Sequence, residues 1–128
     1  MSGANMPSAR AILGRLGEDA AARHLAATGY TLVARNWRCA SGELDVVARQ
    51  GDQMVFVEVR TRRGSQTHPE ASVGSIKARR LTMLAYTYLE CAGLSAESAW
   101  RIDVIAVEID FAGRVTRLEQ IEYAVGEG

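Results

Sequence analysis

Residues 42–64, GELDVVARQGDQMVFVEVRTRRG, contain the feature that most restricts the fold: two strongly apolar runs on either side of a Gly-Asp pair. Glycine followed by aspartate suits a two-residue hairpin turn, because the glycine can take a positive φ. If Gly51 and Asp52 form that turn, Gln50 faces Gln53, and the other facing pairs follow in step. The stretch therefore predicts an antiparallel hairpin whose register is set by its turn.

This register brings together two acids that lie inside the apolar runs. Asp45 faces Glu58, and Glu43 faces Arg60. Because side chains alternate across a strand, these four residues share one face of the hairpin. The other face should pack into the core, and it carries Leu44, Val46, Val55, Val57 and Val59.

Two facing carboxylates repel each other, so another group must offset their charge. Directly opposed residues in a sheet have Cβ atoms about 4.5–5.5 Å apart, and like charges at that distance destabilise the pair. A divalent cation such as Mg²⁺ would offset the repulsion, since carboxylates, backbone carbonyls and water are its usual ligands. The alternative is a solvated face on which Asp45 and Glu58 pair only with Arg60 and Arg62.

Two helices are predicted outside the hairpin. Apolar residues recur at helical spacing over residues 9–28, and Gly29 follows as a stop. Residues 75–91 predict a second helix, with Ser75 as its cap and Gly93 at its end.

Alternating apolar residues predict five strands, at 30–38, 43–49, 53–62, 101–110 and 114–125. The order α-β-β-β-α-β-β predicts an α/β fold, a mixed β-sheet with helices packed on it. We expect residues 1–8 to be a flexible N-terminal tail and residues 9–125 to form a single domain.

The composition excludes several classes of protein. Fifteen basic and fifteen acidic residues leave no net charge, so any affinity for nucleic acid must come from local clusters. Cys39 and Cys91 have no metal-binding spacing, and we expect them to be buried free thiols. No apolar run approaches the ~18 residues of a membrane span, and no signal peptide is apparent. We therefore expect a cytoplasmic protein that does not enter a membrane.

Two charged residues lie on helix faces that should turn inward. Glu18 is on the stripe of Ala21 and Leu25, and Lys77, the chain's single lysine, is on the stripe of Leu81. A cation near a helix N-terminus opposes the helix dipole, so Lys77 requires carboxylates or phosphate nearby. The alternative is that each residue lies at the exposed edge of its stripe.

These residue types suit phosphodiester hydrolysis. A carboxylate-bound metal lowers the pKa of a bound water, and a basic group stabilises charge on the phosphoryl oxygens. Arg60 stays protonated in proteins, so it can bind phosphate but cannot be a general base. Nucleic acid, and DNA in particular, would supply the phosphates to a basic cluster of Arg60, Arg62, Arg63, Lys77, Arg79 and Arg80. His68 is either a further phosphate contact or a surface residue.

The motifs GRLGEDAAARHLAATGY, RNWR, the hairpin, Lys77 and RIDVIAV, in this order, resemble the YraN-like protein family. The wider resemblance is to the PD-(D/E)XK nucleases, above all the archaeal Holliday-junction resolvase group, over residues 14 to about 108. It implies a restriction-endonuclease-like core.

By position, the resemblance implies that Glu18, Asp45 and Glu58 bind Mg²⁺ or Mn²⁺. Arg60 stands where this superfamily usually has lysine, and Lys77 is the residue that could take over that role. Resolvase relatives act as dimers, so a homodimer is also implied. Asp103, within RIDV, we interpret as structural.

The sequence is compatible with three functions. The first is a metal-dependent endonuclease acting on branched or structured DNA, with Glu18, Asp45, Glu58, Arg60 and Lys77 as catalytic residues. The second is a nucleic-acid-binding module on the same fold that no longer cuts, for which Arg60 is the main support. The third is a protein-interaction or assembly factor, for which the neutral charge is the hint.

Overall fold

The structure is a computed structural model that describes residues 6–64 and 73–125, so the prediction for His68 lies outside the described residues. The elements follow the predicted order. They are α1 (Ala9–Ala27), β1 (Thr31–Cys39), β2 (Gly42–Gln50), β3 (Gln53–Arg63), α2 (Ser75–Cys91), β4 (Trp100–Ile109) and β5 (Val115–Ile121).

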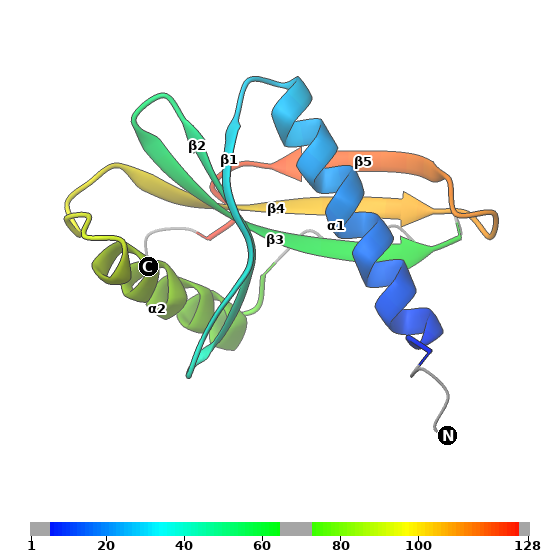
Figure 1. The fold of residues 1–128 in the computed structure, drawn as a ribbon, viewed down its shortest axis with the longest axis horizontal. Helices are drawn as coiled ribbons and strands as arrows, with labels where there is room; N and C mark the ends of the chain where they lie inside the picture. Colours follow the sequence, from blue (N-terminus) through cyan, green and yellow to red (C-terminus); the bar gives the residue numbers. More distant parts are fainter. Residues whose placement is uncertain (1–5, 65–72, 126–128) are drawn as a thin grey trace.

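The strands form one five-stranded sheet in the order β1-β2-β3-β4-β5. Neighbouring strands are antiparallel except β3 and β4, which are parallel and are connected through α2. The prediction of a mixed α/β fold is therefore confirmed (Figure 1).

The helices pack on opposite faces of this sheet. Leu25 of α1 packs with Val57 of β3 in one apolar cluster, and Leu84 of α2 packs with Phe56 of β3 in the other. Figure 1 shows α1 crossing β3, β4 and β5, and α2 lying toward β1 and β2. Because α2 covers the face that carries Glu58, Glu58 is buried and not solvated as the alternative required, whereas Asp45 is half-buried.

At three of the four helix ends, a residue type that commonly caps or ends helices lies at the end. Ser8 caps α1 by accepting a hydrogen bond from the Ala11 N–H, and Gly29 ends that helix with φ +96°. Gly93 ends α2 with φ +72°. The predicted cap at Ser75 is wrong: Gly74 has the extended N-cap backbone and Ser75 is already helical, so α2 begins without a side-chain cap.

The hairpin has the predicted turn and register over most of its length. Gly51 has φ +58°, and the facing pairs run from Gln50 with Gln53 to Val46 with Val57. In a continued ladder, Leu44 and Val59 would be the next hydrogen-bonded pair. The Val59 N–H instead donates to Asp45 Oδ2 at 2.9 Å. The pairing of β2 with β3 ends at Val46 and Val57.

This early end of the ladder corrects three predictions. Asp45 and Glu58 lie beyond the last facing pair, Val46 with Val57, so they are not a facing pair of the ladder. Leu44 does not share a cluster with Val46 and Val57 but packs on the α2 side of the sheet, since it is not held opposite Val59. Glu43 faces and ion-pairs with Arg38 of β1, with a separation of 2.6 Å, and does not face Arg60. Alternation fails here because a side chain, not a backbone carbonyl, accepts the ladder hydrogen bond.

The two cysteines are free, but the prediction that they are buried is wrong. Cys39 is half-buried at the end of the edge strand β1, and Cys91 is exposed as the last residue of α2. Both lie at element ends, where neighbouring elements cover less of each side chain.

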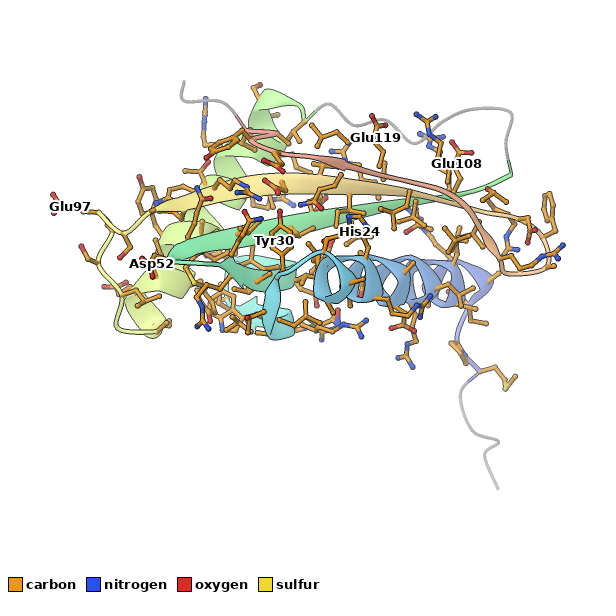
Figure 2. All side chains as sticks on the ribbon, turned by 90° about the horizontal axis from the view of Figure 1, so that it is seen from above. His24, Tyr30, Asp52, Glu97, Glu108 and Glu119 are labelled. Carbon is orange, nitrogen blue, oxygen red and sulfur yellow. The ribbon has the colours of Figure 1, made fainter. Side chains whose placement is uncertain are left out.

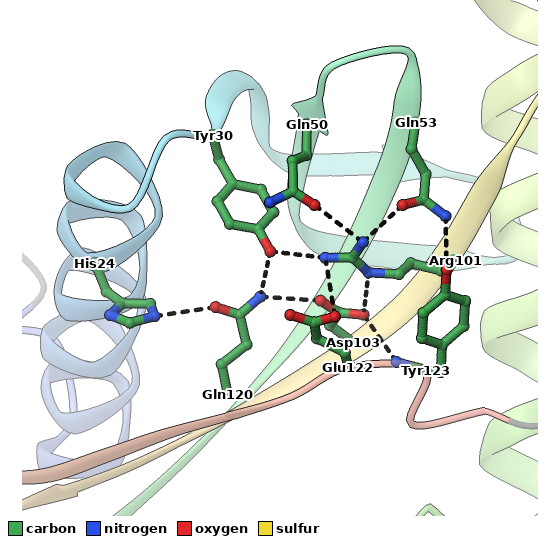
Figure 3. Close-up of polar contacts among 9 residues, drawn as sticks. All are labelled: His24, Tyr30, Gln50, Gln53, Arg101, Asp103, Gln120, Glu122 and Tyr123. Atoms are coloured by element: carbon green, nitrogen blue, oxygen red, sulfur yellow. Dashed lines mark hydrogen bonds and ion pairs between the residues drawn. The ribbon is translucent and has the colours of Figure 1, made fainter.

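A buried polar network joins α1 to the strands (Figure 3). Arg101 and Asp103 of β4 form an ion pair of 2.9 Å, and their side chains are 4% and 0% exposed. Asp103 also accepts from Gln120, and Arg101 donates to the Tyr30 hydroxyl. The Asp103 carboxylate is therefore engaged by several hydrogen-bond donors, as expected of a structural residue. Such a network is stabilising only when its polar groups are satisfied, and no described buried side-chain atom lacks a partner.

Helix α1 lies in close contact with β3 at Gly17. A Cβ atom at this position would overlap the side chain of Thr61, whereas one at Gly14 would meet no atom within 4 Å. Gly17 therefore lets the backbone of α1 approach β3, and Glu18 is the next residue along that helix.

We predict opposite effects for alanine at these two helical glycines. Gly17→Ala should lower the free energy of unfolding by about 1–3 kcal/mol, because the new methyl group overpacks the contact with Thr61. Gly14→Ala should raise it by about 0.5–1 kcal/mol, because alanine favours the helix and the site is open. Urea denaturation measures both, and Thr61→Ala in the Gly17→Ala background should recover part of the loss. Equal effects of the two alanines would contradict the close contact.

Candidate functional site

A pocket of about 380 Å³ lies where β2 and β3 separate. Residues of α1, α2, β2 and β3 line this pocket. Its charged lining residues are Glu18, Glu43, Asp45, Glu58, Lys77 and Arg80. The structure thus brings together four of the five predicted catalytic residues, and the fifth, Arg60, lines the adjoining groove.

Lys77 and Glu58, which both line the pocket, form an ion pair. The Lys77 Nζ lies 2.6 Å from Glu58 Oε2, and the two side chains are 46% and 11% exposed. The expectation that a carboxylate compensates a cation near the start of α2 is therefore confirmed. Lys77 neutralises a buried strand acid while much of its own side chain stays in solvent.

Asp45 is held by its hydrogen bond from the Val59 N–H, but its electrostatic surroundings are unfavourable. Burial raises the pKa of Asp45 to about 7, against the opposing effect of the Val59 hydrogen bond. The neighbouring Glu58, Glu18 and Glu43 carboxylates raise this pKa further. The ionised form of Asp45 therefore lacks compensating positive charge.

Glu18 reaches the same pocket from α1. Burial raises the pKa of Glu18, and the negative charge of Glu43 adds to the effect, while Arg35 opposes it. Glu18 is half-buried and lies in the pocket lining, so it is neither fully turned inward nor fully exposed at the edge of its stripe. Carboxylates thus converge from α1, β2 and β3.

Carboxylate oxygens are the donors that Mg²⁺ and Mn²⁺ prefer, so the side chains of Asp45 and Glu58, with Glu18, suit such an ion. Among residues 6–64 and 73–125, no three acidic, His or Cys side chains are gathered as in a preformed metal centre. Mg²⁺ commonly takes one or two protein carboxylates and completes its shell with water and substrate phosphate. The donor set would therefore supply only part of the shell of such an ion, and other ligands would have to complete it.

A basic groove of about 580 Å³ adjoins the acidic pocket. Its charged lining comprises Arg60, Arg62, Arg63, Lys77 and Glu58, so Lys77 and Glu58 are common to both cavities. Arg63 is held there by a hydrogen bond to the Asp110 carbonyl.

Of the three predicted basic residues of α2, Lys77 lines this groove and the other two lie apart from it. Arg80 lines the acidic pocket, and Arg79 is exposed and lines neither cavity. The basic cluster expected from the sequence is therefore divided. Arg79 and Arg80 are consecutive residues of a helix, so their side chains point about 100° apart.

Sequence reasoning placed Glu43 opposite Arg60 and left it out of the site. The Gly42-Glu43 start of β2 was part of the motif, but no pattern indicates which acid turns toward the pocket. The role of the Val59 N–H was also missed, since a backbone donor has no sequence signal.

The fold and pocket define a class: a mixed α/β protein with carboxylates and one lysine gathered beside an arginine-lined groove. The chain belongs to a family described as Uncharacterised protein family UPF0102, whose model matches residues 17–107. This agrees with the YraN-like resemblance.

Similar proteins are found in several bacteria. UPF0102 proteins of Chloroflexus aurantiacus and Roseiflexus castenholzii are 49% and 46% identical over 122 and 123 residues, covering 95% of this chain and 99% of each relative. A UPF0102 protein of Streptomyces griseus is 49% identical over 107 residues, covering 83% of this chain and 90% of the relative. In the described part of this chain, neither helix is long and apolar enough to cross a membrane.

We predict that Asp45 makes the metal-free protein less stable as the pH rises. The pKa of Asp45 is about 7 in the folded protein, against 3.8 for an unperturbed aspartate such as that of the unfolded chain. Between pH 3.8 and pH 7, therefore, Asp45 keeps its proton only in the folded state. The free energy of unfolding should therefore fall by about 2–4 kcal/mol between pH 4 and pH 7 and then level off. Urea denaturation in EDTA across this range measures it.

Asp45→Asn should remove this pH dependence, so the variant should exceed the wild type in stability at pH 8 and match it near pH 4. Asp52→Asn, an equivalent change in the hairpin turn, is the control and should keep the wild-type profile. Identical profiles for wild type and Asp45→Asn would show that Asp45 is ordinarily ionised in the folded protein.

Proposed function

We propose that this protein is a metal-dependent, nuclease-like protein that hydrolyses phosphodiesters in branched or structured DNA. The proposal includes a restriction-endonuclease-like core within the PD-(D/E)XK superfamily, Mg²⁺ or Mn²⁺ as cofactor, and a cytoplasmic location. One observation carries it: Glu18, Asp45, Glu58 and Lys77, from four elements, line one pocket that opens beside an arginine-lined groove. Partly buried acids whose pKa is raised by burial and by neighbouring carboxylates are typical of functional sites.

Each residue has a distinct role in this proposal. Asp45, oriented by the Val59 N–H, and Glu58 would hold the cation, with Glu18 as a further ligand. The cation, when bound, activates a water and offsets charge on the phosphoryl oxygens. Arg60 would hold a phosphate of the nucleic acid, since a guanidinium binds phosphate through two parallel hydrogen bonds.

The second candidate is a DNA-binding protein on this fold that does not cut. Arg60 favours it, because a guanidinium cannot take a proton from water at the position where the superfamily usually has lysine. The single lysine of the pocket comes from α2 and is paired with Glu58. Binding without cleavage in the presence of either metal is the outcome that selects this candidate.

We predict that the wild type cleaves at least one of four-way junctions, flaps and single strands with Mg²⁺ or Mn²⁺. Asp45→Asn and Glu58→Gln should each lower the rate at least about 100-fold, because each removes a cation ligand. Asp52→Asn and Glu97→Gln are matched controls on two connections at one end of the molecule and should retain activity (Figure 2). Cleavage that is equal in all five proteins would mean contamination or another site.

We further predict that the groove binds nucleic acid through its arginines. Arg62→Gln should weaken DNA binding and lower the slope of log affinity against log salt by about 0.9, as expected for one lost phosphate contact. Arg49→Gln, at an exposed position beside the hairpin turn, is the matched control and should leave both unchanged. Fluorescence anisotropy in EDTA from 50 to 300 mM salt measures the slopes; equal slopes would exclude Arg62 from the interface.

A further inference from the structure

We infer that Lys77 is an exchangeable counter-ion: it neutralises Glu58 when no cation is bound, and an incoming divalent cation displaces it into the arginine-lined groove. The inference rests on the proposed function. It adds an order of events, in which cation binding releases the ammonium group that then meets a substrate phosphate. Lys77 thus links the two halves of the site.

The position of Lys77 carries this inference. Lys77 lines both the acidic pocket and the basic groove, as do Glu58 and Val59. The Lys77 side chain is 46% exposed, whereas that of Glu58 is 11% exposed, so the lysine has solvent to move into and the acid does not. A four-carbon side chain with a compact ammonium can change partners by rotating its own bonds.

Charge balance gives the reason for exchange. The Lys77 Nζ is 2.6 Å from Glu58 Oε2, so the ammonium occupies the space from which a cation would contact that oxygen. A divalent cation repels the ammonium and offsets the negative charge of Asp45 and Glu58 more completely than Lys77 does. Once Glu58 is bound by the cation, it no longer compensates Lys77.

The first turn of α2 does not itself stabilise the displaced lysine. The first turn of α2 has no acidic residue, and the helix dipole disfavours a cation there. In the groove, Arg60, Arg62 and Arg63 would repel Lys77 unless a phosphate lies among them. Substrate phosphate therefore completes the exchange, and cation and nucleic acid should bind cooperatively.

The test measures cation binding to the protein alone, by calorimetric titration with Mg²⁺ and Mn²⁺. Lys77→Met keeps the length of the side chain but removes the competing charge, and it should bind the cation about tenfold more tightly than the wild type. Removing any nearby positive charge also strengthens cation binding through space, so Arg80→Met is the matched control. Arg80 lines the same pocket, and its replacement should change the affinity less than about threefold.

A second measurement follows the lysine directly. Because Lys77 is the only lysine in the sequence, protein labelled with ¹³Cε-lysine gives a single side-chain NMR signal. That signal should shift on addition of Mg²⁺, with the same midpoint as the calorimetric titration. In Glu58→Gln, the signal of the cation-free protein should already resemble the displaced state.

The outcomes separate this inference from the proposed function. If wild type and Lys77→Met both fail to bind Mg²⁺ and Mn²⁺, the cation site itself is wrong and the exchange falls with it. If the wild type binds a cation while the lysine signal stays unchanged, or if Lys77→Met and Arg80→Met gain affinity equally, the exchange alone is wrong. Tighter binding specific to Lys77→Met, with a shifted lysine signal in the wild type, supports both.

Discussion

The hydrogen bond from the Val59 N–H to Asp45 is the interaction on which the candidate site depends. It replaces the ladder bond that Leu44 would otherwise accept, and the pairing of β2 with β3 ends there. The two strands then separate enough for a pocket to form, into which α1 contributes Glu18 and α2 contributes Lys77. An unbroken ladder would close this space, because paired strands lie about 4.8 Å apart.

The pocket concentrates negative charge where the fold supplies little to balance it. Four carboxylates line it, and burial together with mutual repulsion raises the pKa of Asp45 to about 7. By contrast, Asp103, which is also an acid of the sheet, is paired with Arg101 and accepts further hydrogen bonds. Asp103 is thus compensated by its neighbours, whereas Asp45 is not. This difference marks the pocket, and not the Arg101–Asp103 network, as the place where a ligand would relieve an unfavourable state.

Much of the fold could be predicted because its determinants are local. Glycine at the turn set the hairpin register, and apolar spacing located both helices and all five strands. Predictions failed where a long-range contact overrides a local rule. Leu44 departs from strand alternation because of Asp45, and Glu43 turns to Arg38 on the neighbouring strand. Cys91 was expected inside because cysteines are commonly buried, but its position at the end of α2 leaves it exposed.

The sequence by itself determined the elements, the register of the hairpin near its turn and the helix stripes on which Glu18 and Lys77 lie. Those properties depend on turn chemistry and on side-chain periodicity, which act over a few residues. Only the tertiary structure decided that Lys77 pairs with Glu58, that Glu43 joins the pocket and that the basic residues divide between two cavities. The physical reason is that these contacts join helices and strands distant in the chain, and their geometry follows from how α1 and α2 pack on opposite faces of one sheet.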